Sequence, residues 1–318
     1  MKRLLVLLFA FAIAAPAAAS DDFPSKLITL IVPYSAGGTD AQYRKLAELA
    51  GKELGQQIVV INKPGGAGTA AVADMARTAA PDGYTIAAST APLLRQPHMM
   101  KVNFDPLNDF TWISRLGDFT FVITVREDSP FKTLPELIQW AKENPGKLTY
   151  GSPGLASSQY IAMATLSQVA GIETRHIPYK GGNEIQNALL SNQVMVGVNT
   201  LAGVMPASGN MPGIRAIASF DAKRLESLPD LPTVREYGYD VVQESPYGLV
   251  GPKGMKPEVV ARLQEAFRKA MLSPENAKLL ESLRQREAFL PADEYTKWVA
   301  QAYEKEREAV ERLKLRSQ

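Results

Sequence analysis

Residues 27–40 read LITLIVPYSAGGTD, an apolar, β-branched run followed by a loop that contains two glycines. The first six of these residues predict a buried strand, because a short continuous apolar run bounded by turn residues is typical of one. Residues 39–54 predict a helix, since Leu46, Leu49 and Ala50 fall on one helical face. A strand that leads through a short loop into a helix is the repeating unit of parallel α/β sheets. The fold is therefore expected to be α/β.

The same alternation of strand and helix continues along most of the chain. Further strands are expected at 58–61, 84–89, 119–126, 148–150, 175–179, 194–198 and 214–219, and helices between them at 70–79, 134–143, 158–169 and 184–190. Beyond Gly251 the pattern predicts three helices, at 257–271, 274–283 and 293–315. Strands regularly separated by helices predict parallel sheets with helices on both faces, in the doubly wound arrangement.

The first residues have the organisation of a secretory signal peptide. Lys2 and Arg3 precede an uncharged apolar run at 4–15, and residues 17–19 are the small alanines that signal peptidase cleaves. The apolar run is too short to cross a bilayer, which takes about 20 residues. We therefore expect residues 1–19 to be removed and the mature protein to be soluble in the periplasm.

The charge balance excludes several classes of partner and site. The chain has 35 Lys and Arg against 33 Asp and Glu, and loss of Lys2 and Arg3 with the signal peptide makes the two counts equal. A neutral protein does not indicate a nucleic-acid or anionic-membrane surface. The absence of cysteine and the presence of only two histidines exclude thiol chemistry and a histidine-rich metal centre. We expect no cofactor and no metal.

Three loops join the end of a predicted strand to the start of a predicted helix. In the first, residues 33–40, Gly37 and Gly38 allow a sharp turn. The helix that follows presents unpaired N–H groups and the positive end of its dipole, so the loop can hold a carboxylate without any Arg or Lys. A plain glycine turn capped by Thr39 or Asp40 is the alternative.

The second loop, residues 150–158, has the same position in the other half of the chain. The hydroxyl groups of Ser152, Ser157 and Ser158 add donors to the backbone N–H groups of this loop. The alternative is that Ser157 or Ser158 serves only as the N-cap of the helix.

The third loop, residues 62–69, contains Gly66-x-Gly68-x-x-Ala71, a relaxed dinucleotide-binding fingerprint. Such a site needs an acidic residue at the end of the next strand to bind the ribose. The next predicted strand, 84–89, is followed by Thr90 and ends without one. A nucleotide site is therefore not expected.

Sequence motifs of catalysis are missing. The chain has no G-x-S-x-G elbow, no H-E-x-x-H, no P-loop and no Cys nucleophile. Ser152 and His176 with an unspecified Asp would make a Ser–His–acid arrangement, but no motif points to it. We expect no enzyme activity and no catalytic residue. The alternative to a binding protein is an enzyme, a secreted serine hydrolase that uses Ser152 or Ser157.

Several short motifs follow one another along the chain. They are Pro33, Gly37, Gly38, Asp40 and Arg44, then NKPGGAG at 62–68, PDGYT at 81–85, YGSPG at 150–154, PYKG at 178–181 and LPTVREYG at 231–238. Each motif alone is weak, but the collinear series resembles the substrate-binding proteins of tripartite tricarboxylate transporters, also called Bug receptors.

The resemblance implies a fold of the type II periplasmic-binding-protein kind. Two doubly wound α/β lobes, joined by two crossing segments near 121–125 and 244–249, would close on a ligand in the cleft between them. Lobe 1 would comprise 20–123 and 245–318, and lobe 2 would comprise 124–244. In the family, backbone and hydroxyl groups of the first and second loops hold a carboxylate of the ligand.

On this resemblance we expect the ligand-binding residues to come from these loops and from positions near them. They are Tyr34, Ser35, Ala36, Gly37, Gly38, Thr39, Asp40, Thr90, Ser152, Gly154, Ala156, Ser157, Ser158, Lys180 and Asn199. Tyr160 stands where many members have His, and Asn199 where many have Asp. Because Asp would favour an amine whereas Asn can donate and accept, an amino-acid ligand is not favoured.

The function implied is that of a receptor which captures a small di- or tricarboxylate or an aromatic acid. It would deliver this ligand to integral membrane transporter subunits, and the receptor itself is expected to be a monomer. A ligand-sensing partner of a membrane signalling protein would use the same fold, and the sequence does not separate the two roles.

Overall fold

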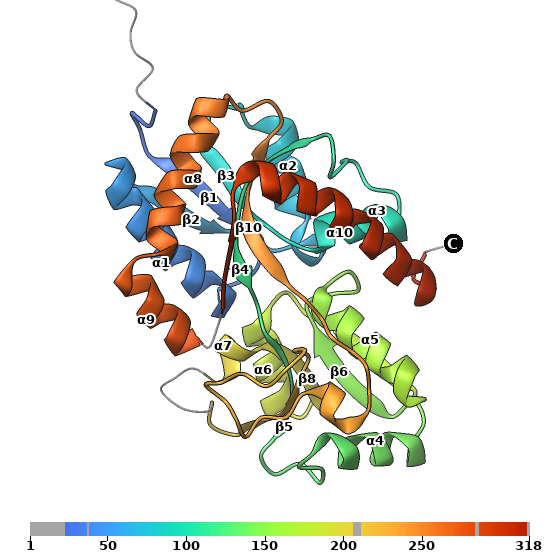
Figure 1. Cartoon of the computed structure of the whole chain (residues 1–318). Coiled ribbons are helices and arrows are strands. Elements are labelled where there is room, and N and C mark those ends of the chain that lie inside the picture. Colours follow the sequence, from blue (N-terminus) through green and yellow to red (C-terminus); the bar gives the residue numbers. More distant parts are fainter. Residues whose placement is uncertain (1–22, 37, 206–210, 284–285, 317–318) are drawn as a thin grey trace, which may run out of the picture.

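The computed structural model describes residues 23–36, 38–205, 211–283 and 286–316. Two β-sheets, each covered by helices, form two lobes that lie one above the other in Figure 1. The predicted α/β class with two lobes is confirmed. The predicted signal peptide, residues 1–19, lies outside the described residues. None of the described helices combines the length and the apolar character that a membrane crossing needs.

The upper lobe is built on a six-stranded sheet with the order β11-β4-β10-β3-β1-β2. Its strands are β1 (Ile28–Val32), β2 (Ile58–Asn62), β3 (Thr85–Ser89), β4 (Phe110–Asp118), β10 (Pro246–Pro252) and β11 (Arg286–Leu290). Strand β1 pairs in parallel with β2 and β3. Strand β10 runs antiparallel to β3 and β4, and β11 runs antiparallel to β4.

The lower lobe is built on a five-stranded sheet with the order β7-β6-β8-β5-β9. Its strands are β5 (Phe121–Arg126), β6 (Leu148–Ser152), β7 (Thr174–Pro178), β8 (Val196–Thr200) and β9 (Ile214–Ser219). Strand β6 is parallel to β7 and β8, whereas β5 is antiparallel to β8 and β9. Both sheets are therefore mixed rather than wholly parallel as predicted. The strand that arrives from the other lobe, β5 here and β10 above, runs against its neighbours.

Helices cover both sheets. Those of the upper lobe are α1 (Gly38–Leu54), α2 (Ala70–Thr78), α3 (Pro92–Met99), α8 (Pro257–Met271), α9 (Pro274–Leu283) and α10 (Ala292–Arg312). Those of the lower lobe are α4 (Leu134–Glu143), α5 (Ser158–Ala170), α6 (Gly182–Leu190) and α7 (Leu201–Val204), and two 3-10 turns, η1 (Gly66–Gly68) and η2 (Val234–Tyr237), lie in loops. Helices α1 and α8 lie against each other and bury Leu46 and Leu263 in the core.

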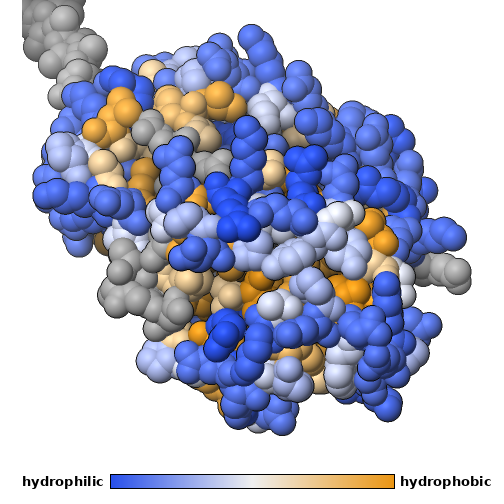
Figure 2. Space-filling model, turned by 60° about the horizontal axis from the view of Figure 1, so that its bottom comes forward, coloured by the Kyte–Doolittle hydropathy of each residue, from blue (hydrophilic) through white to orange (hydrophobic). Residues whose placement is uncertain are grey.

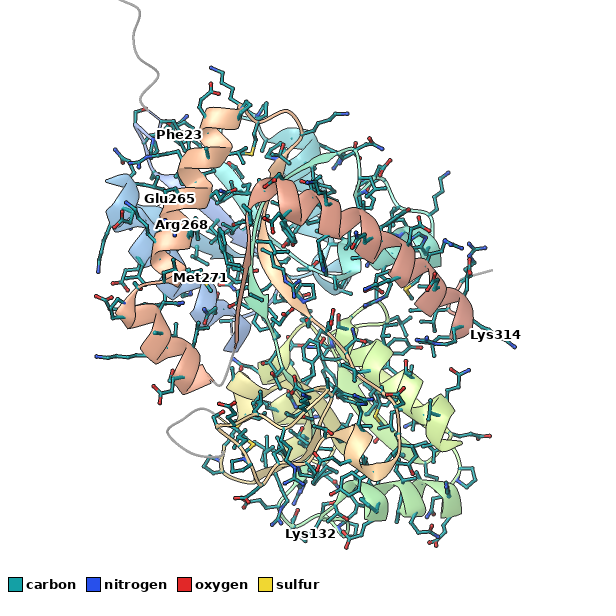
Figure 3. All side chains as sticks on the ribbon, in the orientation of Figure 1. Phe23, Lys132, Glu265, Arg268, Met271 and Lys314 are labelled. Atoms are coloured by element: carbon teal, nitrogen blue, oxygen red, sulfur yellow. The ribbon has the colours of Figure 1, made fainter. Side chains whose placement is uncertain are left out.

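The outward faces of the helices carry charged side chains. Arg268 donates to the carboxylate of Glu265 on the outward side of α8, where Figure 3 labels both side chains. In Figure 2, hydrophilic residues cover most of the visible face, and hydrophobic residues gather across its middle.

The chain passes between the lobes at two adjacent places. Strand β4 leads into β5 through Phe119 and Thr120, and Glu244 and Ser245 lead back into β10. The two segments lie side by side, because the Phe119 N–H donates to the Ser245 carbonyl over 2.8 Å. The sequence placed the first crossing at 121–125, but β5 pairs with β8 and β9 from Phe121 onward, so the chain crosses just before that strand.

Candidate ligand-binding site

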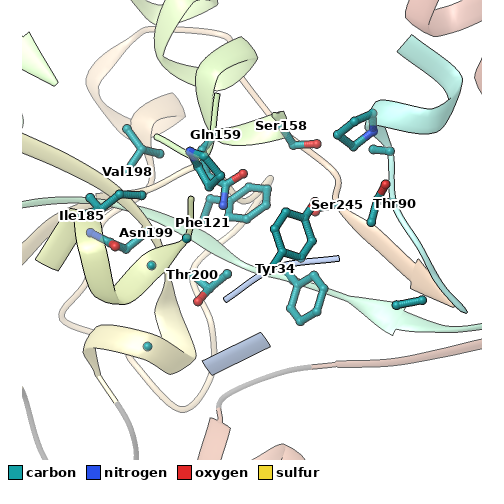
Figure 4. Close-up of a pocket in the computed structure, with 18 of the residues that line it drawn as sticks. Tyr34, Thr90, Phe121, Ser158, Gln159, Ile185, Val198, Asn199, Thr200 and Ser245 are labelled. Carbon is teal, nitrogen blue, oxygen red and sulfur yellow. The ribbon is translucent and has the colours of Figure 1, made fainter. Parts of the chain in front are cut away.

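A cavity of about 50 Å³ lies between the two lobes (Figure 4). Because a buried water needs roughly 10–15 Å³, the cavity has room for a few waters. The upper lobe lines it with Tyr34, Ser35, Tyr43, Ala88, Ser89, Thr90, Ala91 and Pro92. The lower lobe and the crossing segments add Phe119, Phe121, Pro153, Ser158, Gln159, Gly181, Gly182, Ile185, Gln186, Val198, Asn199, Thr200, Gly203, Ser245 and Pro246.

The wall of this cavity is uncharged. Within the described part of the chain, no Asp, Glu, Lys, Arg or His lines it. Its polar groups are hydroxyls, carboxamides and backbone amides, and its apolar groups include the rings of Phe119 and Phe121. A buried ligand charge needs hydrogen-bonding compensation, so an anion here must be held by neutral donors.

Three helices begin at the cavity wall. Ser158 and Gln159 open α5, Gly182 opens α6 and Pro92 opens α3, and all four line the cavity. The first N–H groups of a helix have no partner inside the helix, and its dipole places partial positive charge there. Because proline has no N–H, α5 and α6 offer the better donors. This convergence of helix N-termini suits an anionic group.

Three buried side-chain oxygens at the cavity have no hydrogen-bond partner among the described residues. They are Ser35 Oγ, Ser158 Oγ and Asn199 Oδ1. An unpaired buried polar atom costs about 1–3 kcal/mol, and native proteins pair nearly all such atoms. These three oxygens therefore mark positions suited to contact with a ligand or its bound waters.

Tyr34 adds a hydroxyl that stays protonated. Burial raises the pKa of Tyr34 to about 12, against a smaller lowering by its hydrogen bond with the Thr90 side chain. Thr90 Oγ1 in turn donates to the Gly68 carbonyl over 3.2 Å. Gly68 has a φ of +95°, and a Cβ atom there would lie 2.5 Å from the Tyr34 hydroxyl oxygen. The glycine of the third loop therefore makes room for Tyr34.

The first loop is held by a carboxylate that does not itself line the cavity. Asp40 is buried and accepts hydrogen bonds from Arg44 Nε and Asn62 Nδ2, both over 2.8 Å. Asn62 Nδ2 also lies 3.0 Å from the Tyr34 carbonyl oxygen and donates to it. Gly38 and Thr39 open α1, and Gly37 lies outside the described residues. Asp40 thus fixes the segment that carries Tyr34 and Ser35.

In the second loop, Ser157 is the N-cap of α5. Its Oγ accepts from the Tyr160 N–H over 3.1 Å and donates to the Gly154 carbonyl over 2.7 Å. The alternative that Ser157 serves as the N-cap of this helix is therefore confirmed. Its neighbour Ser158, in contrast, lines the cavity.

Ser152 and His176 lie together, with 2.7 Å between Ser152 Oγ and His176 Nε2. Ser152 is fully buried and lies outside the cavity wall, and no acidic side chain among the described residues is bonded to His176. Burial lowers the pKa of His176 to about 4, so the ring is neutral near pH 7. A serine nucleophile needs access to substrate, and Ser152 is buried outside the cavity wall.

Each of the two loops also touches the opposite lobe. Arg95 of α3 donates through Nη1 to the Ala156 carbonyl over 2.7 Å, and its other nitrogens bind both carboxylate oxygens of Glu306 at 2.6 and 2.7 Å. Ala156 packs with Met99 and Val310 of the upper lobe. On the other side, Asn183 Nδ2 of α6 donates to the Ala36 carbonyl over 2.7 Å. The lobes are therefore in contact on both sides of the cavity.

Some of the predicted site residues line the cavity and others do not. Tyr34, Ser35, Thr90, Ser158 and Asn199 line the cavity. Ala36, Gly154 and Ala156 lie at contacts between the lobes. At Gly154 the contact is close, because a Cβ atom there would lie 3.3 Å from the Ala67 Cβ atom. The Lys180 side chain is exposed and does not line the cavity.

Sequence reasoning missed the opening of α6 and both crossing segments as parts of the wall. The consecutive glycines Gly181 and Gly182 were the available signal for α6, since glycines before a helix permit close approach of a ligand or another lobe. Phe119 and Ser245 carry no comparable signal, because their place depends on how the two sheets are joined.

Comparison with known proteins agrees with this architecture. A family model described as the tripartite tricarboxylate transporter family receptor matches residues 42–315. The UPF0065 protein in the gbd 5' region of Cupriavidus necator is 40% identical over 304 residues, which cover 95% of this chain and 92% of that protein.

Solved structures of the same architecture superpose over nearly the whole chain. The periplasmic binding protein BugD is 28% identical with a TM-score of 0.87, covering 93% of this chain and 100% of that chain. MatC from Rhodopseudomonas palustris, solved with bound malate, is 25% identical with a TM-score of 0.82, covering 91% of this chain and 100% of that chain.

Proposed function

Because this chain belongs to the tripartite tricarboxylate transporter receptor family, we propose that it is a periplasmic receptor for a small carboxylate. It would be exported through the cleaved signal peptide at residues 1–19 and deliver its ligand to integral membrane transporter subunits. The observation that carries the proposal is an uncharged cavity at which α5 and α6 begin.

The carboxylate would bind at the start of α5 and α6. Backbone N–H groups and the hydroxyls of Ser158 and Ser35 are donors that need no counter-ion, and helix dipoles favour negative charge at this point. MatC, which has the same fold, holds malate, and this supports a small carboxylate as the ligand of the present protein.

Capture would proceed by hinge motion. The two lobes would turn about the paired crossings at Phe119 and Ser245. A ligand that touches Ser35 of one lobe and Ser158 of the other stabilises the closed arrangement by its higher affinity for that arrangement. The buried position of Ser152 supports a receptor without catalysis.

A thermal-shift screen tests the proposal. The mature protein is heated with a library of di- and tricarboxylates and aromatic acids, and with their neutral methyl esters as matched controls. At about 100 times its dissociation constant, a true ligand adds about 2.7 kcal/mol to the free energy of unfolding. We expect at least one acid to raise the melting temperature while its ester does not. Equal shifts with acid and ester, turnover of the esters, or no shift with any acid would contradict the proposal.

A further inference from the structure

Asn199 is a polar residue in the part of the cavity wall that Ile185 and Val198 also line. It lies on β8, is almost fully buried and lines the cavity. Figure 4 places it on the same side as Ile185 and Val198, away from Ser158 and Thr90. Its Oδ1 atom is buried and accepts no hydrogen bond from the described residues. This oxygen is therefore separate from the carboxylate donors at the start of α5.

Neighbouring hydrogen bonds engage the nitrogen of the Asn199 carboxamide and leave its oxygen unpaired. Thr124 Oγ1 donates to the Gly197 carbonyl over 2.8 Å, which uses the single proton of that hydroxyl. The Asn199 atom 2.9 Å from Thr124 Oγ1 must then be the donor Nδ2, because an oxygen there would meet no proton. This pair of hydrogen bonds leaves Oδ1 as an acceptor without a partner among the described residues.

A hydrogen-bond acceptor at Asn199 Oδ1 favours a ligand that carries a hydrogen-bond donor. Building on the carboxylate-receptor function proposed above, we propose that Asn199 determines specificity by accepting a hydrogen bond from a hydroxyl group of the ligand. The ligand class is then a hydroxy-carboxylate, with the carboxylate at α5 and α6 and the hydroxyl on the side of Val198.

Other partners for Oδ1 fit the wall less well. An ammonium group would need a buried counter-charge, and within the described residues no carboxylate lines the cavity. The nearby carboxamide of Gln186 uses its Nε2 to donate to the Gly203 carbonyl over 3.0 Å. A ligand hydroxyl brings a donor without charge, which matches the wall.

Pairs of ligands that differ by one hydroxyl test the inference. Calorimetry would compare malate with succinate, and butanoate and benzoate with each of their monohydroxylated isomers, because the isomers scan the position of the hydroxyl. For the wild type we expect at least one hydroxylated acid to bind about 10-fold or more tightly than its parent, since the parent leaves Oδ1 unpaired. Asn199→Leu, which is similar in size and removes the acceptor, should abolish that preference.

Two further variants keep the test decisive. Asn187→Leu changes an exposed asparagine on α6 and should retain the wild-type preference. Asn199→Ala should give the same loss of preference as Asn199→Leu and serves if the larger side chain prevents folding. If acids bind the wild type without a hydroxyl preference, or if the preference survives in a folded Asn199 variant, the inference is wrong while the receptor function stands. If no acid binds the wild type at all, both fail.

Discussion

The two lobes meet at an uncharged cavity and at a charged contact beside it. In the cavity, all lining side chains of the described residues are neutral. Beside it, the fully buried guanidinium of Arg95 binds both carboxylate oxygens of Glu306 and the Ala156 carbonyl. The difference indicates that permanent charge positions the second loop, whereas dipoles are left to receive the ligand.

The energetic reason lies in desolvation. A buried arginine is tolerated only with a partner, and removing the partner of a buried ion pair is costly. An arginine in the cavity would lack such a partner whenever the ligand leaves. Helix N-termini and hydroxyls carry no net charge, so they can be exposed to water and covered again at lower cost.

The largest effect is expected from breaking the Arg95 ion pair. Glu306→Gln leaves Arg95 buried without a counter-charge and should lower the free energy of unfolding by about 3–5 kcal/mol, measured by urea denaturation. Glu304→Gln is the matched control, because Glu304 pairs with Arg307 on the exposed side of the same helix and should leave the midpoint nearly unchanged. Equal midpoints for both variants would contradict the structural role of Arg95.

The next effect concerns the neutral donors of the cavity. Ser158→Ala removes a hydroxyl proposed to bind the ligand carboxylate and should weaken binding by about 1.5–3 kcal/mol, the range for a hydrogen bond to a charged group. Lys180→Ala removes the nearby exposed cation and should change the dissociation constant by less than about threefold. Calorimetry with an acid from the screen measures both. A larger loss from Lys180→Ala than from Ser158→Ala would mean that charge, not dipoles, holds the anion.

A smaller effect is expected where the lobes touch without charge. A Cβ at Gly181 would lie 2.3 Å from Ser35 Oγ, so Gly181→Ala should hinder closure and weaken binding about 10-fold, or about 1.4 kcal/mol. Asn187→Ala is its control, because Asn187 is exposed on the same helix and does not line the cavity. The backbone of Gly181 is extended, with a φ of 173°, so alanine introduces no backbone strain there. Indistinguishable affinities in the two variants would show that closure does not bring Ser35 and Gly181 together.

A last effect, on stability rather than on binding, comes from His176, which is bonded to Ser152 of the second loop. Burial lowers the pKa of His176 from 6.5 to about 4, so the unfolded chain takes up a proton at a higher pH than the folded one. Between these values the unfolded state binds more protons, and the stability contributed by His176 is lost as the pH falls from about 6.5 through about 4. Urea midpoints at pH 7 and pH 5 should differ more for the wild type than for His176→Gln. The same difference in both proteins would show that His176 is not buried as described.

Much of the fold follows from local sequence, because β-branched runs such as 58–61 and helical faces such as that of Leu46 need no long-range information. Helix α3 escaped prediction since it opens at Pro92 and contains Pro97, which mimic a loop. Strands β4 and β11 escaped as well, because they are held by antiparallel pairing with segments far away in the chain. The loops could be placed at strand ends for the same local reason.

The roles of residues within those loops could not be predicted. Ser157 and Ser158 are adjacent and chemically identical, yet the first caps α5 and the second faces the cavity. Asp40 satisfies the family motif by holding Arg44 and Asn62 rather than by lining the wall. The direction in which each side chain points depends on contacts between the lobes, and the spacing of residues along the sequence does not reveal those contacts.

A crystal structure of the mature protein with the tightest-binding acid of the screen tests the central claim most directly. The account predicts that the carboxylate oxygens lie within about 3.2 Å of backbone N–H groups at the start of α5 or α6 and of Ser158 Oγ, with no Arg or Lys side chain in contact. A carboxylate paired with Lys180 or another cation, or bound outside the cavity between the lobes, would contradict it.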